Sequence, residues 1–143
     1  MFLKSLFRKK RLELPDSWAV CHLGDERASF LRINTPLKDP VYQDGFAVST
    51  VFAVPMRALG DETDLSFAFE DALFAELQDA GRGIVAAVMT TETTREFITY
   101  TPNAAVGAEV QASLTAKFPA LTVTAENKED AAWELFHSLL PRA

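Results

Sequence analysis

The chain has 143 residues, 48% of them hydrophobic, which is enough to bury the core of one domain. Its formal net charge is −6, and its single cysteine, Cys21, excludes an intrachain disulfide framework. Because it lacks metal-ligand spacing, an apolar run of about 18 residues and a signal-peptide pattern, we expect a cytoplasmic protein that holds no cofactor or metal.

The charge is distributed unevenly along the chain. Residues 1–14 form a basic segment, whereas the residues after position 11 carry 9 basic and 20 acidic side chains. We expect a single domain over residues 15–143, and its acidic surface would bind nucleic acid phosphates poorly, so no nucleic acid partner is expected for it. The basic side chains of the segment are Lys4, Arg8, Lys9, Lys10 and Arg11.

The basic segment also carries apolar side chains that would share one side of a helix, namely Phe2, Leu3, Leu6 and Phe7. Two interpretations are open. The segment is either a solvated leader that ends at Pro15, or an arm that makes weak contact with an anionic membrane surface or a partner. The second interpretation predicts peripheral membrane association through residues 1–11.

The domain begins with a predicted β-hairpin. Residues 18–23 and 28–34 have strand composition, and the polar residues 24–27 between them include a glycine for the turn. Residues 35–45 contain two prolines and a glycine, which predicts a loop.

A strand and a long helix follow. Residues 46–56 alternate large apolar side chains with small ones, the pattern of a strand with one face toward a core. From about Glu62 to Ala80 the apolar residues recur at helical spacing, and Gly81 is expected to end the helix. The helix is apolar over a wide arc because Phe67 and Phe74 lie off its main stripe, which suggests either deep burial or a second contact surface.

The second half of the chain starts with a second hairpin. Residues 84–89 are apolar throughout and residues 95–100 alternate, with a threonine-rich turn between them. Asn103 is expected to cap a helix that ends at Pro119. Residues 121–125 are predicted to form a short strand, and Asn127 to cap a last helix.

These elements predict an α+β fold. The order from residue 46 to residue 125 is βαββαβ, which is that of a ferredoxin-like sandwich with two helices on one face of the sheet. The first hairpin is expected to extend the sheet at an edge, and the last helix follows the sandwich. A doubly wound parallel fold is disfavoured because the turn of the second hairpin is too short for a crossover.

The most notable polar cluster lies on the second strand of that hairpin. Alternation places Arg95, Phe97 and Thr99 on one face and Glu96, Ile98 and Tyr100 on the other. The residues that we single out as a binding site are Arg95, Glu96, Phe97, Thr99 and Tyr100. A structural role, with a strand-end ion pair and two core aromatics, is the competing interpretation.

Other groups are explained more simply by structure. Adjacent Cys21 and His22 point to opposite faces of a strand and cannot act as nucleophile and base. His137 lies near the C-terminal end of a predicted helix, where a histidine side chain interacts favourably with the helix dipole. The paired acids Glu70–Asp71 and Glu129–Asp130 diverge on a helix, and acids near helix starts are accounted for by capping. No glycine-rich phosphate loop is present.

Several short motifs, taken in their order and spacing, resemble a bacterial family called domain of unknown function 695 over about residues 17–140. They are Trp18, Leu-Arg-Ile-Asn at 31–34, Glu-Asp-Ala-Leu at 70–73 with Leu77, Thr-Arg-Glu-Phe-Ile-Thr-Tyr-Thr at 94–101 and Glu-Asp-Ala-Ala-Trp at 129–133. The usual Asp-Pro-x-Trp is Asp130-Ala131-Ala132-Trp133 in this chain. The resemblance implies an α+β, ferredoxin-like domain with no established activity, and a link to the regulation of RNA decay would be analogy alone.

The sequence therefore leads to a ranked set of functional hypotheses. The first is a non-enzymatic, protein-binding or regulatory module that uses an exposed sheet face to contact a partner or a second copy of itself, because two helices cannot cover both faces of the sheet. The second is a small hydrolase-like enzyme with a site near Arg95, Glu96 and Tyr100. The third is membrane association through the basic segment.

Overall fold

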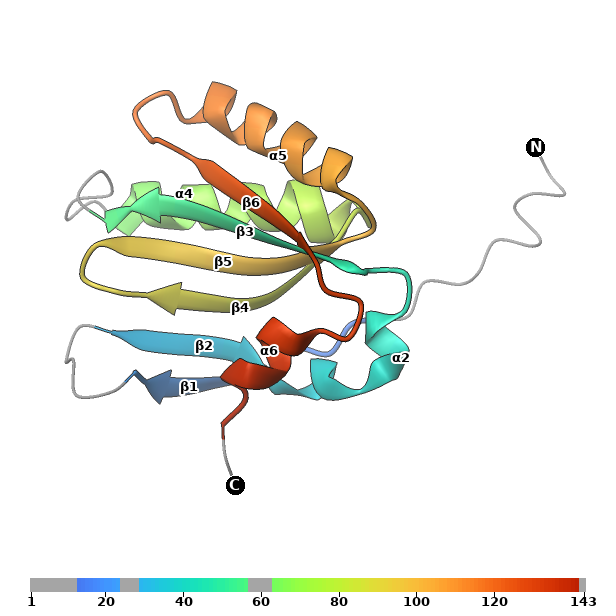
Figure 1. The fold of residues 1–143 in the computed structure, drawn as a ribbon. Coiled ribbons are helices and arrows are strands. Elements are labelled where there is room, and N and C mark those ends of the chain that lie inside the picture. The colour runs from blue at the N-terminus through green and yellow to red at the C-terminus, as the bar shows by residue number, and fades with distance from the viewer. Residues whose placement is uncertain (1–12, 24–28, 57–62, 142–143) are drawn as a thin grey trace, which may run out of the picture.

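In the computed structural model, residues 13–23, 29–56 and 63–141 are described, and within them two helical layers enclose one antiparallel sheet (Figure 1). The six strands have the order β1-β2-β4-β5-β3-β6. The elements in chain order are β1 (Trp18–His22), β2 (Phe30–Asn34), η1 (Thr35–Lys38), α2 (Pro40–Gln43), β3 (Val48–Pro55), α4 (Thr63–Leu73), η2 (Phe74–Asp79), β4 (Ile84–Thr90), β5 (Thr94–Thr101), α5 (Ala104–Lys117), β6 (Thr124–Glu129) and α6 (Glu134–Leu139).

The α+β class is confirmed, as are both hairpins. β1 pairs with β2 and β4 with β5, in each case antiparallel. The first hairpin joins the sheet through β2, which pairs with β4, so β1 is an edge strand. The six-strand order is not the four-strand order of a ferredoxin-like sandwich, because this hairpin adds two strands beside β4.

Each face of the sheet has its own apolar cluster. On the first face, α4, η2 and α5 pack over the sheet around Phe52, Phe69 and Phe97. On the second face, η1 and α6 contribute Leu37, Trp133 and Phe136 to a separate cluster. Figure 1 shows α6 in front of the sheet and α4 behind it. The second face is therefore only partly open, whereas two long helices alone would leave it uncovered, because the short helix α6 covers part of it.

The first long helix has the predicted extent, but its pitch changes. It is α-helical to Leu73 and continues as the wider η2 turn to Asp79, and Gly81 follows at a positive φ of 71° that suits glycine. Of the two aromatics off its main stripe, Phe74 packs edge-on against Trp18 with the ring centroids 6.4 Å apart. Phe67 remains 58% exposed.

Residues 35–45, predicted to be a loop, contain two short helices. Pro36 and Pro40 stand in the first turns of η1 and α2, where a missing backbone N–H breaks no helical hydrogen bond. The side chain of Asp39 caps α2 by accepting a hydrogen bond from the N–H of Val41 at 3.0 Å. Each of these prolines therefore begins a short helix and does not interrupt one.

The C-terminal elements differ most from the prediction. The last strand is not residues 121–125 but Thr124–Glu129, a polar edge strand that pairs with β3. Leu121 and Val123 are buried before it begins. Asn127, expected to cap a helix, lies within this strand and accepts a hydrogen bond from the Thr50 hydroxyl at 2.7 Å. Edge pairing of the backbone outweighs the low strand propensity of this polar sequence.

Helix α5 agrees with its prediction and shows how closely the layers approach. Asn103 caps it by accepting a hydrogen bond from the N–H of Val106 at 3.2 Å. A Cβ atom at Gly107 would lie 2.6 Å from Asn127 Oδ1 and 2.8 Å from Thr50 Cγ2. Only a residue without a side chain lets α5 pack this closely on β3 and β6.

We therefore expect G107A to destabilise the protein, although alanine favours a helix interior by about 1 kcal/mol. Forcing a methyl group against the hydrogen-bonded Thr50 and Asn127 side chains costs about 1–3 kcal/mol, and the strain outweighs the propensity. Urea unfolding at constant m-value measures the difference. The control is A108G at the exposed neighbouring position, which loses helix propensity alone; a G107A protein more stable than the wild type would contradict the close approach.

Candidate functional site

The turn between β6 and α6 is held by a stack of two aromatic rings. The rings of Tyr100 and Trp133 lie 3.8 Å apart, centroid to centroid, at an interplanar angle of 7°. The indole N–H of Trp133 donates to the carbonyl of Phe46 at 2.8 Å. Trp133 is fully buried and has the left-handed backbone conformation, with φ 54° and ψ 39°, which costs a bulky residue roughly 1–2 kcal/mol. Burial of the stacked rings must offset this strain.

Asp130 ties the same turn to the start of α6. Its carboxylate accepts hydrogen bonds from the N–H groups of Glu134 at 2.8 Å and Leu135 at 3.1 Å. It also accepts one from the Tyr100 hydroxyl at 2.7 Å, and that hydroxyl accepts one from the N–H of Phe136 at 3.1 Å. The first backbone donors of α6 are therefore satisfied by side chains.

The pKa values of this pair are displaced in opposite directions. Burial and the hydrogen bond to Asp130 raise the pKa of Tyr100, so it stays a neutral hydroxyl donor. Burial alone would raise the pKa of Asp130, but the hydrogen bonds from Tyr100, Glu134 and Leu135, together with the positive charge of Lys128, lower it below its ordinary value. The junction is thus built from an ionised acceptor and a neutral donor, a structural and not a proton-transferring arrangement.

A second polar cluster surrounds Arg95 on the opposite face of the sheet. The guanidinium donates to the Ser66 hydroxyl on α4 and, at 3.3 Å, to the Thr90 hydroxyl on β4. The Arg32 guanidinium of β2 pairs with the Glu70 carboxylate of α4. Burial lowers the pKa of Arg95, the negative charge of Glu70 raises it and the positive charge of Arg32 lowers it further. The cluster fastens α4 to three strands.

Of the predicted binding residues, three are fully buried. Phe97, Thr99 and Tyr100 have exposed fractions of 0%, and Arg95 and Glu96 are half-buried. The predicted division between faces is correct, since Phe97 lies in the cluster under α4 and α5, whereas Tyr100 lies in the cluster under α6. Phe97, Thr99 and Tyr100 therefore do not lie on an exposed sheet face, whereas Arg95 and Glu96 remain partly accessible.

The residues of the suggested hydrolase site do not converge. Arg95 faces α4 and Glu96 faces the opposite side of the sheet. Tyr100 shares a face with Glu96 but stands four residues along the strand, a separation of about 13 Å. The space beside Tyr100 is filled by Trp133. Arg95, Glu96 and Tyr100 therefore do not line a common cavity.

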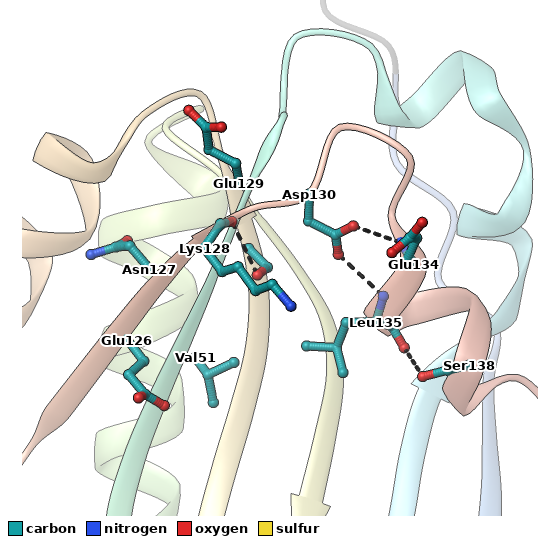
Figure 2. A pocket seen from close by; sticks show the side chains of 10 residues that line it. Val51, Glu126, Asn127, Lys128, Glu129, Asp130, Glu134, Leu135 and Ser138 are labelled. Atoms are coloured by element: carbon teal, nitrogen blue, oxygen red, sulfur yellow. Dashed lines mark hydrogen bonds between the residues drawn. The ribbon is translucent and has the colours of Figure 1, made fainter.

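The structure instead has a groove on the second face, beside α6. It has a volume of about 580 Å³. Its floor is β3, one wall is β6 and the other is α6 (Figure 2). Its lining residues are Ser49, Val51, Glu126, Asn127, Lys128, Glu129, Asp130, Glu134, Leu135 and Ser138.

The lining combines an acidic rim with apolar patches. Four of its ten residues carry a carboxylate and one, Lys128, carries an ammonium group. Val51 on the floor and Leu135 on the wall are half-buried, so both offer apolar surface. Figure 2 shows Lys128 extending between Val51 and Leu135, while Glu129 points away from them. Such a lining fits an extended segment that is both basic and apolar.

The comparison with known protein families matches residues 16–140 to a family of unknown function, DUF695. The chain belongs to this family. No curated protein and no solved structure matches it. Three residues of the motifs that resemble DUF695 connect elements of the fold. Trp18 packs on Phe74, and Asp130 and Trp133 hold the turn before α6. The family pattern in these places accounts for the fold, and of the groove lining it includes Glu129 and Asp130.

The predicted arm, made of Phe2, Leu3, Lys4, Leu6, Phe7, Arg8, Lys9, Lys10 and Arg11, lies outside the described residues. In the described part of the chain, no three His, Cys, Asp or Glu side chains are grouped as metal ligands. Within the same ranges, no helix has both the length and the apolar character required to cross a membrane.

The groove was missed in the sequence because β6 was placed too early. With residues 121–125 taken as the strand and Asn127 as a helix cap, Glu126 fell between the two elements, and Lys128, Glu129 and Asp130 fell at the start of a helix. Asp130 does cap the helix, as that interpretation implied. The available signal was the alternation of Thr124, Glu126 and Lys128, which places three polar side chains on one face of an edge strand.

Asp130 should make the stability depend on pH in the acid range. Because its pKa is lower in the folded protein than the ordinary 3.8, the unfolded chain binds the proton more readily. Its contribution is therefore complete above the ordinary pKa and is lost as the pH falls through the folded pKa. We expect the stability difference between wild type and D130N to shrink as the pH is lowered from about 5 to about 2.

Urea unfolding across this pH range provides the measurement. The control is E129Q, which removes the exposed carboxylate of the preceding residue at the end of β6. A wild type to D130N difference that stayed constant over the range would contradict a lowered pKa for Asp130.

Neutralising Glu70 should destabilise the protein through its arginine neighbours. E70Q leaves Arg32 and Arg95 without the intervening carboxylate, and loss of a partly buried charged hydrogen bond costs about 1–3 kcal/mol. The neighbouring exposed acid on α4, changed in D71N, is the matched control and should alter stability by less than about 0.5 kcal/mol. Equal stability of E70Q and D71N would show that the cluster does not fasten α4.

Proposed function

We propose that this protein is a non-enzymatic binding module that holds an extended basic segment of a partner protein in the groove beside α6. The observation that carries the proposal is the groove itself, where an acidic rim surrounds apolar surface at Val51 and Leu135. Opposite charge guides a basic partner to this surface, and apolar contacts there retain it.

The rigidity of the groove supports the same proposal. One wall, α6, is held by the Tyr100–Trp133 stack and by the bonds from its N–H groups to Asp130. The other wall, β6, pairs along its length with β3. A preformed groove loses little conformational entropy when a ligand enters, which favours binding by a small surface.

Catalysis receives less support from the geometry. Arg95, Glu96 and Tyr100, the residues of the suggested enzyme site, do not line a common cavity. In the groove, Asp130 is engaged by three hydrogen bonds, and its pKa is lowered and not raised toward neutrality. A general acid or base needs a pKa near the working pH.

We also propose that β3 to β6 constitute a ferredoxin-like unit, enlarged by the first hairpin. What supports this is the neighbour order β4-β5-β3-β6 within the larger sheet, and the packing of α4 and α5 on one face. The groove would then lie on the face that a four-stranded unit leaves uncovered, next to its edge strand.

Selection of displayed random decapeptides on the full-length protein tests the binding proposal. We expect the enriched peptides to combine Lys or Arg with apolar residues. V51K on the floor and S138K on the α6 wall should each weaken their binding by about tenfold or more, because each places a cation in the groove. S138K guards against misfolding of V51K, since Ser138 is exposed.

The matched control is T115K on α5, an exposed position outside the groove lining. Its hydroxyl donates to a backbone carbonyl of its own helix at 2.8 Å, as the hydroxyl of Ser138 does at 2.6 Å. The control should bind the enriched peptides as the wild type does. Enrichment of acidic peptides, or equal binding by wild type and S138K, would refute the groove as the binding surface.

A further inference from the structure

We infer that the groove beside α6 is occupied, in the free protein, by residues 1–12 of the same chain, the part of the basic segment that precedes the described residues. The inference rests on the proposed function of the groove and identifies how that site is regulated. A partner segment would have to displace residues 1–12 in order to bind.

The first argument is complementary chemistry. The groove offers the carboxylates of Glu126, Asp130 and Glu134 around apolar surface at Val51 and Leu135. Residues 1–12 have five basic residues and no acid, and they also carry two phenylalanines and three leucines. Both the charge and the apolar content of the segment match what the groove presents.

The second argument is position. The described chain begins at Glu13, and Leu14 packs against the cluster that contains Trp133 and Phe136 of the α6 region. The exit is fixed there, because the Asn34 side chain donates to the carbonyl of Pro15 at 2.7 Å and accepts from the N–H of Ser17 at 3.1 Å. The described chain therefore begins on the face of the sheet that carries the groove.

The third argument is reach and local concentration. Twelve extended residues span up to about 40 Å, and the described chain starts at the cluster to which α6, one wall of the groove, also contributes. A tether this short gives an effective concentration in the millimolar range, so even a contact with a millimolar dissociation constant is substantially occupied. Charge screening makes the contact sensitive to salt.

Trypsin provides a direct test because it cuts after the lysines and arginines of the segment. If the segment is docked about 80% of the time, its cleavage is about fivefold slower than that of an always accessible segment. We expect this protection in the full-length wild type at low salt and expect it to disappear at 0.5 M salt, a concentration at which the Debye length is about 4 Å. Mass spectrometry of the N-terminal fragments gives the rate.

The variant that should abolish protection is E126Q/E134Q, which removes two exposed carboxylates of the groove. The matched control is D71N/E92Q, which changes the net charge equally at exposed positions on α4 and in the turn after β4. Protection that survives in E126Q/E134Q, or is lost equally in D71N/E92Q, would overturn the inference. So would protection that rises with protein concentration, which indicates a second copy, or that requires anionic phosphatidylserine vesicles, which indicates a membrane.

A binding measurement separates this inference from the function on which it rests. A synthetic peptide of residues 1–12 should bind the full-length K9Q/K10Q variant about fivefold more tightly than the wild type, because the wild-type groove is mostly occupied. Equal binding to both proteins would refute self-occupancy and leave the groove as a peptide site. No binding to either protein, together with failure of the decapeptide selection, would refute the proposed function as well.

Discussion

The fold depends on the stack of Trp133 on Tyr100. One ring belongs to the central part of the sheet and the other to a turn near the C-terminus, so their contact fixes the last helix against the second face. The left-handed backbone at Trp133 is tolerated because the buried indole and its bond to the Phe46 carbonyl hold it in place. Without this contact, the six residues of α6 would be too short to persist as an isolated helix.

This contact also explains why the sheet is covered on both sides with so few helices. The long helices α4 and α5 occupy the first face. On the second face, α6 shields the Tyr100 end and stops before reaching β6. The groove is the consequence, because it lies between α6 and the polar edge strand β6. Binding surface and core thus arise from the same packing arrangement.

The sequence was a good guide wherever one periodic pattern met one environment. The buried run of β4, the alternating β3 and the Asn103 cap of α5 are confirmed because local signals and tertiary packing agree there. The predictions for β6 and Pro36 were wrong. The polar residues of β6 are held by pairing with β3, and Pro36 begins a short helix in a segment predicted to be a loop. Motif residues such as Tyr100 were noticed correctly but assigned to a surface, since alternation gives the face of a strand and not what covers it.

The sequence by itself determined the α+β class, the two hairpins, the family resemblance and the contrast between a basic segment and an acidic domain. These features follow from spacing and composition, which are local properties of the chain. The tertiary structure decided that Phe97, Thr99 and Tyr100 are buried and that Glu126, Val51 and Leu135 share a groove. Those outcomes depend on contacts between residues far apart in the chain, and no local pattern encodes which helix will cover which end of a sheet.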